Sequence, residues 1–422
     1  MRRLLEESFR ATVAAADPLA ILGPQLPRPP RGRTLVVGAG KAAASMAVAV
    51  EREWPASAPL EGLVLTRYRH ALPTSRIRVV EAGHPVPDEA GEAGAREILQ
   101  RAGALAENDL LIALLSGGGS SLLSLPAPDI SMADLRVVTT QLLRCGAAIQ
   151  EINTVRKHLS AIQGGRLAAV CKAPAVALII SDVTGDDPTH IASGPCAPDP
   201  TTFRDALDVL ARYRVTPPPA VCTRLESGMA GRIPETPKPG DAVFARVDNR
   251  VVATAHRSLE AAAETFRAAG ITPVILGDTV TGEASEVAKV LAALVREVRR
   301  YGTPFAPPVA LISGGECTVT LRAEGGRGGR CSEFLLALSI ELEDIEGIHA
   351  IAADTDGIDG SEDNAGALIG PDTTTRARSA GLEARQCLAA NDSYGFFAAL
   401  GDLVVTGPTL TNVNDYRAII VA

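Results

Sequence analysis

Short, fully apolar segments alternate with amphipathic ones along this chain. A run such as Leu110–Leu115 is typical of a parallel strand, because strands of that kind are buried on both faces. The segments between such runs have apolar positions three or four residues apart, which predicts helices. Strands alternating with helices at this spacing predict parallel βαβ units and a doubly wound α/β fold.

The expected elements fall into two groups. In the first half we expect strands at 34–37, 62–66, 77–80, 110–115 and 174–180, and helices at 1–22, 42–51, 89–101, 132–144 and 149–159. In the second half we expect strands at 251–253, 273–276, 309–312, 318–321, 348–352 and 403–406, and helices at 258–269, 285–301, 333–343, 386–390 and 393–400. Prolines and glycines interrupt the periodicity at 227–241, which is typical of a domain boundary. We therefore expect an N-terminal α/β domain at 1–235 and a smaller C-terminal α/β domain at 236–422.

Composition narrows the class of protein. With 422 residues, 46% of them hydrophobic, the chain is long enough for two buried cores. A net charge of −8 and an aromatic content of 3% argue against a nucleic-acid surface. The seven cysteines are scattered without CxxC pairs, so we expect a reducing compartment, no disulfides and no zinc site. Acidic residues follow Arg2-Arg3 at once and no segment is long enough to span a membrane, so we expect a cytoplasmic protein.

Several expected strands end in glycine-rich turns. Such turns expose backbone N–H groups that an anion can approach, and the alternative is a tight turn or a flexible surface loop. The turns are Gly38-Ala39-Gly40-Lys41, Ser116-Gly117-Gly118-Gly119-Ser120-Ser121, Ser313-Gly314-Gly315-Glu316, and the arginine-bearing loop Gly325–Arg330. Because the chain uses this device repeatedly, we interpret the turns as phosphate or carboxylate sites.

The first turn admits a second interpretation. Gly38–Ala43 fits G-x-G-x-x-A, a dinucleotide fingerprint, with a strand before it and a helix after it. The next strand ends in Thr66-Arg67 and lacks the acidic residue that would bind a ribose hydroxyl, although an arginine could tolerate the 2′-phosphate of NADP. Lys41 is not explained by such a site. It is either an anion ligand or a solvated surface lysine.

Two acidic loops complete the candidate chemistry. Asp182 and Asp187 follow the strand at 174–180, where ligands of open α/β sheets bind, and are candidates to hold Mg²⁺. The second loop is Asp354–Gly360 and contains Asp356. For the first loop the alternative is a capped, solvated loop, and the second does not fit an EF-hand because Ile358 occupies a ligand position. A lone histidine, His158, is expected to be structural rather than catalytic. Anion loops, cations and carboxylates together suit phosphoryl transfer, which depends on positioning and neutralisation of charge.

Eight motifs, spread in order over nearly the whole chain, resemble the glycerate 2-kinases of the MOFRL type. They are VVGAGKAA, LLSGGGSSLL, NTVRKHLSAIQGGRLA, SDVTGDDPTHIASGPCAPDPTTF, LISGGECTV, GRGGR, DTDGIDG and TGPTLTNVNDYRAIIV. The resemblance implies ATP- and Mg²⁺-dependent phosphorylation of D-glycerate at its 2-hydroxyl, giving 2-phosphoglycerate. It also implies a Rossmann-like N-terminal domain, a smaller C-terminal domain and an active site in the cleft between them.

The resemblance also implies that Lys41 and Arg330 face the reacting groups and are catalytic. From the residues themselves we expect that Asp182 or Asp187 ligates Mg²⁺ or orients the hydroxyl. We also expect the nucleotide to contact Ser116–Ser121, Ser313–Glu316 and Asp356. The family usually has Asn-Gln after the arginine where this chain has Cys331-Ser332, which leaves the acceptor open.

Alternatives to a D-glycerate kinase remain. They are a kinase for a related sugar acid, an NADP-linked hydroxypyruvate reductase and a non-catalytic binder of sugar acids. We expect no nucleic-acid or membrane partner and leave a homodimer open.

Overall fold

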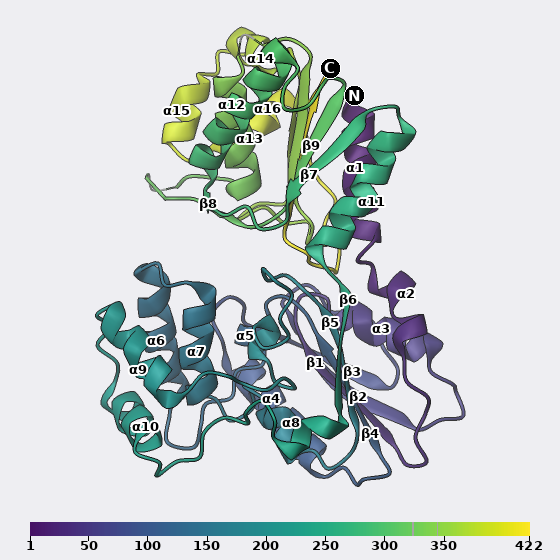
Figure 1. Ribbon diagram of the computed structural model, residues 1–422, viewed down its shortest axis with the longest axis vertical. Coiled ribbons are helices and arrows are strands. Elements are labelled where there is room, and N and C mark those ends of the chain that lie inside the picture. Colours follow the sequence, from purple (N-terminus) through teal and green to yellow (C-terminus); the bar gives the residue numbers. More distant parts are fainter. Residues whose placement is uncertain (323–324, 344) are drawn as a thin grey trace. The chain divides into compact units, whose positions relative to one another are not determined.

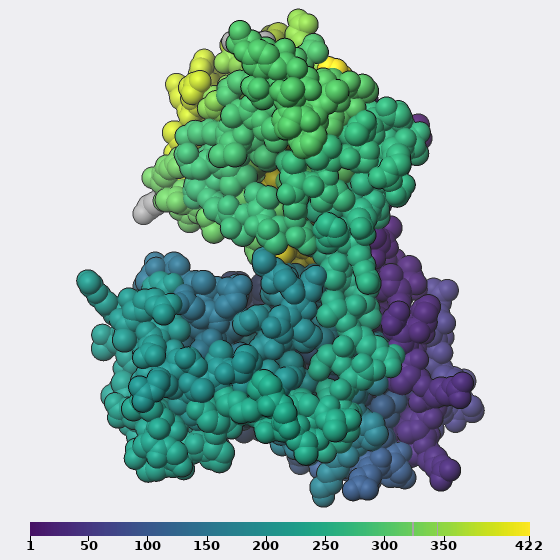
Figure 2. All heavy atoms as spheres, in the orientation of Figure 1, coloured from purple at the N-terminus to yellow at the C-terminus, as the bar shows by residue number. Residues whose placement is uncertain are grey.

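The chain forms two compact units that do not follow its halves. The computed structural model describes residues 1–322, 325–343 and 345–422. Pro18–Val252 form one unit, called here the inserted unit, and Met1–Asp17 together with Ala253–Ala422 form the other, called the terminal unit. In Figures 1 and 2 the inserted unit runs from purple to teal, and most of the terminal unit from green to yellow. The sequence placed the division at 235/236, whereas the chain passes between the units at 17/18 and 252/253.

The inserted unit contains a six-stranded sheet in the order β3-β2-β1-β4-β5-β6. Strands β1 to β5 run parallel to their recorded neighbours, with Val36 opposite Gly62 on one side and Ile112 on the other. Chain order reverses between β1 and β4, so this is the topological switch point of a doubly wound sheet. The strands are β1 (Thr34–Ala39), β2 (Leu60–Arg67), β3 (Ile77–Ala82), β4 (Leu110–Leu115), β5 (Ala175–Ile180) and β6 (Val247–Ala253).

Helices cover both faces of this sheet (Figure 1). Alternate strand residues such as Leu63 and Leu65 pack with Ala95 and Ile98 of α4, while α3 contacts the same strands from the other face. A separate apolar cluster joins α6, α7, α9 and α10 into a helical layer. The helices are α2 (Pro18–Ile21), α3 (Ala43–Glu53), α4 (Glu89–Gly103), α5 (Gly119–Leu122), α6 (Met132–Arg144), α7 (Ile149–Leu159), α8 (Arg166–Val170), α9 (Phe203–Arg212) and α10 (Pro219–Met229), with short 3-10 turns at Gly23–Gln25, Ile191–Ser193 and Ala242–Arg246.

The terminal unit contains a mixed six-stranded sheet in the order β13-β12-β11-β14-β9-β7. Strand β14 is central, antiparallel to both β11 and β9, and β7 pairs parallel with β9. Helices α12 to α16 pack on one face (Figure 1). The elements are α11 (Ala255–Ala268), β7 (Thr272–Gly277), β8 (Gly282–Glu283), α12 (Ala284–Tyr301), β9 (Val309–Ser313), β10 (Cys317–Thr318), α13 (Arg330–Glu341), β11 (Ile348–Asp354), β12 (Gly366–Ile369), α14 (Thr373–Ser379), α15 (Ala384–Ala389), α16 (Ser393–Leu400), β13 (Leu403–Val404) and β14 (Asp415–Val421).

The N-terminal helix α1 (Arg2–Ala14) covers the other face of this second sheet, beside α11 (Figure 1). Leu5 and Phe9 pack with Phe266 of α11 and Ile420 of β14, and all four side chains are buried. The Tyr416 hydroxyl donates to Ser8 Oγ at 2.7 Å. The helix was expected at the start of the N-terminal domain, but its apolar face is buried in the terminal unit.

Local signals explain many element boundaries. The Asp88 side chain accepts the Gly91 amide and starts α4, and Ser131 with Asp134 forms a capping box before α6. Thr202 and Asp205 form the same box before α9, a helix that the apolar pattern alone did not predict. Strand β14 was also missed, because Asp415 and Arg417 interrupt its apolar run although both are buried. In the described part of the chain, no helix is long and apolar enough to cross a membrane.

Candidate active site

The loop after β1 and the loop after β4 lie against each other at the switch point of the inserted unit. The Lys41 amide donates to the Gly117 carbonyl at 2.8 Å, and the Ala42 amide donates to Ser116 Oγ at 3.0 Å. A Cβ on Gly40, which has a φ of +144°, would lie 2.0 Å from Ser116 Oγ. Glycine is therefore required there for the two loops to meet, and their contact places the partly exposed Lys41 beside the Ser116–Ser121 loop.

The Ser116–Ser121 loop has backbone N–H groups available to a ligand. Gly118 has a φ of +80°, so the chain turns sharply before the short helix α5. No hydrogen bond from the amides of Gly117, Gly118 or Ser120 to any described residue is recorded. Amides in a turn of this kind form a concave site that attracts anions.

His84, which the sequence did not single out, lies against this loop. A Cβ added to Gly118 would be 2.9 Å from His84 Nε2 and 3.4 Å from Lys41 Cγ. Burial, followed by the charges of Lys41, Arg67 and Arg156, lowers the pKa of His84 to about 3. The imidazole is therefore neutral at pH 7, mainly because it is buried and also because three cationic side chains lie nearby.

A second row of polar groups supports the loop from behind. Ser193 Oγ lies 2.9 Å from Ser120 Oγ and 3.1 Å from Asn153 Oδ1. Asn153 Nδ2 donates to the His190 carbonyl, so Oδ1 is an acceptor, and Ser193 Oγ can donate its single proton to Asn153 or to Ser120. These contacts tie the Ser116–Ser121 loop to the buried Asn153 and Ser193 side chains.

The acidic loop after β5 contains both candidate metal ligands. Asp182 is partly buried and Asp187 is exposed. One oxygen of Asp187 accepts the Thr189 amide at 2.9 Å, and the exposed carboxylate fits a cation that takes its remaining ligands from water and phosphate. Among the described residues, no group of three or more His, Cys, Asp or Glu side chains is placed to hold a metal ion.

In the terminal unit, Arg330 is the centre of an acidic cluster. Its Nη2 lies 2.6 Å from Asp354, its Nε 2.8 Å from Asp415, and Glu316 lies 3.4 Å away. Asp354 and Asp415 face each other across β11 and β14, which explains how both reach one guanidinium. Burial opposes the charge, but the three carboxylates outweigh it and raise the pKa of Arg330.

The Ser313–Glu316 turn packs tightly within the same unit. Gly315 has a φ of +101°, and a Cβ there would lie 2.3 Å from the Val280 carbonyl. The Gly314 amide donates to Gly277 at 2.8 Å, and the Gly314 carbonyl accepts from Arg417 at 3.0 Å. Close packing therefore explains these glycines, and the Gly314 amide is already used.

The neighbouring loops contribute differently. Asp356 is buried, and its Oδ1 accepts the Ile358 amide at 2.9 Å. Arg327 pairs with Glu362 at 3.2 Å and stacks over the Tyr394 ring, so the two arginines of the glycine-rich loop have different partners. Ala323 and Glu324, next to that loop, lie outside the described residues.

Cys331 and Ser332, the pair that departs from the family pattern, are fully buried. Their amides donate to the two oxygens of Asp359, at 2.9 and 2.8 Å, and Ser332 Oγ donates to Asp359 at 2.6 Å. These contacts fix the first turn of α13, which begins at Arg330. The replacement of the family's Asn-Gln by Cys331-Ser332 therefore alters the contacts that hold the first turn of α13, where Arg330 lies.

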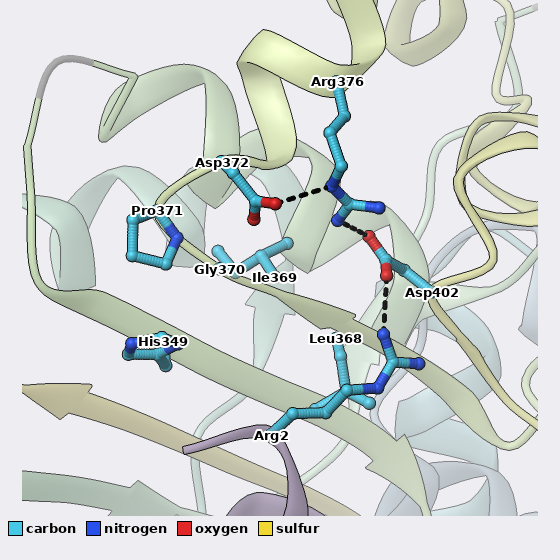
Figure 3. Close-up of a pocket in the computed structure, with 9 residues that line it drawn as sticks. All are labelled: Arg2, His349, Leu368, Ile369, Gly370, Pro371, Asp372, Arg376 and Asp402. Atoms are coloured by element: carbon cyan, nitrogen blue, oxygen red, sulfur yellow. Dashed lines mark hydrogen bonds and ion pairs between the residues drawn. The ribbon is translucent and has the colours of Figure 1, made fainter.

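A cavity of about 350 Å³ lies elsewhere in the terminal unit (Figure 3). Asp402 bridges Arg2, at 2.8 Å, and Arg376, which also pairs with Asp372 at 3.0 Å. Both arginines are thus neutralised by carboxylates. None of the candidate site residues from the sequence lines this cavity.

Known proteins resemble this chain over most of its length. A family model described as "Domain of unknown function (DUF4147)" matches residues 4–226, and one described as "MOFRL family" matches residues 309–415. A protein named "Putative hydroxypyruvate reductase" from Agrobacterium vitis is 51% identical and covers 100% of this chain and 94% of its own length. A "Glycerate 2-kinase" from Pyrococcus horikoshii is 40% identical over 91% of this chain and 86% of its own.

Solved structures agree with the fold. The crystal structure of a glycerate kinase from Thermotoga maritima superposes with a TM-score of 0.88 at 37% identity, covering 100% of this chain and 99% of that one. Fold and loops define a two-unit α/β protein with a lysine-bearing glycine turn at the switch point of its doubly wound sheet. The chain belongs to the glycerate 2-kinase family of the MOFRL type.

Proposed function

We propose that the chain transfers the γ-phosphoryl group of ATP to the 2-hydroxyl of D-glycerate, giving 2-phosphoglycerate and ADP. The observation that carries this proposal is the contact between the β1 and β4 loops, which puts Lys41 on a turn with available amides. Relatives named as glycerate 2-kinases, 38–40% identical over most of the chain, support the choice of substrate.

In this proposal the amides of Gly117, Gly118 and Ser120 bind phosphate oxygens of the nucleotide. Lys41 neutralises the charge that develops on the transferred group, where a positioned cation has its largest effect on rate. Arg330 is the second proposed catalytic cation. Its Nη1 has no recorded partner among the described residues, so it can donate to a reacting group while Asp354 and Asp415 hold the rest of the guanidinium.

Mg²⁺ is the metal that the resemblance implies. Asp182 and Asp187 would hold it, because Mg²⁺ uses one or two carboxylates and completes its shell with water and phosphate oxygens. When bound, it would shield phosphate charge in the transition state. Ser313–Glu316 and Asp356 stay proposed nucleotide contacts, although the Gly314 amide is occupied by Gly277.

Hydroxypyruvate reduction is the second candidate, favoured by the names of two relatives that are 51% and 49% identical. Its cofactor would need the glycines at the end of β1 and just after it for the close approach of a pyrophosphate. Those glycines are already required for packing, because a Cβ on Gly38 would lie 2.3 Å from the Leu114 carbonyl and one on Gly40 would meet Ser116. We therefore favour the kinase.

One assay separates the two functions. ADP release from ATP and Mg²⁺ with D-glycerate is measured beside NADPH oxidation with hydroxypyruvate, and the phosphorylated product is assigned by NMR. We expect glycerate-dependent ADP release and 2-phosphoglycerate. NADPH oxidation without ADP release would refute the kinase, and 3-phosphoglycerate as product would refute the position of transfer.

A further inference from the structure

Arg156 is a cation that the function proposed above does not use. It lies on α7 and is partly buried. Within the described ranges it forms no ion pair, and its recorded hydrogen bond joins Nη1 to Asn153 Oδ1 at 3.3 Å. Burial alone lowers its pKa to about 10, so it keeps its charge at pH 7. A guanidinium has five N–H donors, and the contact with Asn153 uses one of them. The other donors of Arg156 could bind a ligand.

Arg156 is connected to the anion loop by a chain of hydrogen bonds. Asn153, which accepts from Arg156, also accepts from Ser193, and Ser193 contacts Ser120 of the loop. Asn153 and Ser193 are fully buried, so this connection is a built part of the unit. The charges of both Arg156 and Lys41 depress the pKa of His84, whose ring lies against Gly118. The positive charges of Arg156 and Lys41 therefore both act on the space around the His84 ring.

The support beneath this arrangement is strained. Ala192, Ser193 and Gly194 are consecutive residues in the left-handed region, with φ of +51°, +57° and +59°. A side chain on Gly119 would lie 2.6 Å from Ala192 Cβ, so the strained turn packs directly on the loop. Non-glycine residues adopt this conformation at a cost, and such strain is found where a protein must hold functional groups in place.

Electrostatics favours a negatively charged group here rather than at Arg330. Arg330 and Arg417 face Asp354, Asp415 and Glu316, which gives that cluster an excess of carboxylates. We propose that Arg156 binds the carboxylate of the hydroxy-acid substrate, with Asn153 and the turn 192–194 as positioning residues. The proposal rests on the proposed function only for the identity of the acid.

The test combines protein and ligand changes in the full-length chain. Arg156→Met is compared with the wild type for D-glycerate and for D-glyceramide, in which a neutral amide replaces the carboxylate. Because hydrogen bonds to charged groups contribute strongly, we expect Arg156→Met to raise the KM for D-glycerate about 10- to 100-fold and to leave the KM for ATP within a factor of about two. The variant should no longer distinguish the acid from the amide.

Controls separate folding and nucleotide effects. Arg144→Met removes an exposed arginine of α6 and should change neither KM. Arg156→Lys keeps the charge and should recover part of the affinity. An unchanged KM for D-glycerate in Arg156→Met would overturn the proposal, and so would an equal rise in the KM for ATP, which would assign Arg156 to the nucleotide.

Binding measured without ATP keeps this proposal distinct from the proposed function. Calorimetry of D-glycerate with the wild type and with Arg156→Met tests the carboxylate site even if no ADP is released. We expect the wild type to bind and the variant to bind at least about tenfold more weakly. Equal binding by both proteins, or no binding by the wild type, would overturn the proposal.

Discussion

Lys41 and Arg330 carry the same charge in opposite settings. Lys41 shares its surroundings with Arg67 and Arg156, as the depressed pKa of His84 reports, whereas Arg330 is held between Asp354 and Asp415. The cations near His84 are therefore the ones that we propose to bind a phosphate or carboxylate. The charge of Arg330 is largely compensated by the neighbouring carboxylates. Arg330 would therefore act on a ligand through hydrogen bonds rather than through net charge.

Replacing Lys41 with methionine should lower kcat about 100-fold or more, because the cation would be missing where phosphoryl charge develops. Steady-state ADP release with saturating D-glycerate measures the change. Lys172→Met is a matched control, since Lys172 is exposed near the start of β5. Near-normal turnover in a folded Lys41→Met protein would remove Lys41 from the mechanism.

His84 gives a pH dependence of stability. Its folded pKa of about 3 lies below the ordinary value near 6.5, so its contribution is present above pH 6.5 and is lost as the pH falls toward 3. We expect the free energy of unfolding, measured with urea, to fall as the pH is lowered over this window. The fall should be steeper for the wild type than for His84→Gln, by up to about 1 kcal/mol per pH unit. Parallel stability profiles for the two proteins would contradict the assignment.

Only some of the residues around the candidate site could be predicted from the sequence. Lys41 and Ser116–Ser121 stand out because they follow apolar strands at glycine turns. His84 and Arg156 carry no such local signal, because their relation to Gly118 arises only when separate segments pack together. The contacts of Cys331-Ser332 carry no local signal either, since Asp359, which accepts both amides and the Ser332 hydroxyl, lies far along the sequence.

At the scale of elements, loop positions depend on how closely two backbones approach. Gly119 is the clearest case, because a Cβ there would lie 2.6 Å from Ala192 Cβ and 2.9 Å from the Ala39 carbonyl. Neither atom is the end of a flexible side chain. The space between the β1 loop, the β4 loop and the turn 192–194 is therefore filled.

Gly119→Ala should displace the Ser116–Ser121 loop and lower kcat/KM at least about tenfold, with a loss of stability of about 1–3 kcal/mol from overpacking. Assays and thermal unfolding test both effects. Gly103→Ala is the control at the end of α4, where a Cβ meets nothing within 4 Å. Wild-type activity of Gly119→Ala would show that the loop can shift without consequence.

Asp359 holds the start of α13 and with it Arg330. Burial raises the pKa of Asp359 to about 6, although the Ser332 hydroxyl, the Cys331 and Ser332 amides and the Arg330 charge all favour the ionised form. A raised folded pKa means that its contribution is greatest below pH 4 and falls as the pH rises to 6. Between these values we expect the stability advantage of the wild type over Asp359→Asn to shrink by on the order of 2–3 kcal/mol.

Chemical denaturation at pH 4, 5, 6 and 7 measures that difference. Glu362→Gln is a suitable control, because Glu362 pairs with Arg327 outside the α13 start. A wild-type advantage that grows between pH 4 and 6 would reverse the sign and show that Asp359 is ionised throughout.

At the scale of the whole molecule, two α/β units were predictable and their boundaries were not. Apolar periodicity reveals each strand and helix but not the sheet against which a helix packs. The first helix is amphipathic wherever it packs, and its burial against α11 and β14 depends on residues that lie hundreds of positions later. The proline-rich stretch at 227–241 is a connection inside the inserted unit, followed by β6.

Phe9→Ala should therefore destabilise the terminal unit by about 3–5 kcal/mol and leave the inserted unit unaffected. Hydrogen exchange followed by mass spectrometry resolves the two, since faster exchange should appear in peptides from β11 and β14. Leu63→Ala, in the core of the inserted unit, should give the opposite pattern. Faster exchange of β1 and β4 in Phe9→Ala would contradict the division.

The central place of β14 has a consequence for biosynthesis. A ribosome finishes the inserted unit while α1, already made, still has no sheet to cover. The sheet that α1 covers lacks its middle strand until residues 415–421 are synthesised. At translation rates of about 5–20 residues per second, roughly 20–80 seconds pass between the synthesis of α1 and that of β14. The apolar side of α1 is exposed during this time, and we expect chaperones to bind it.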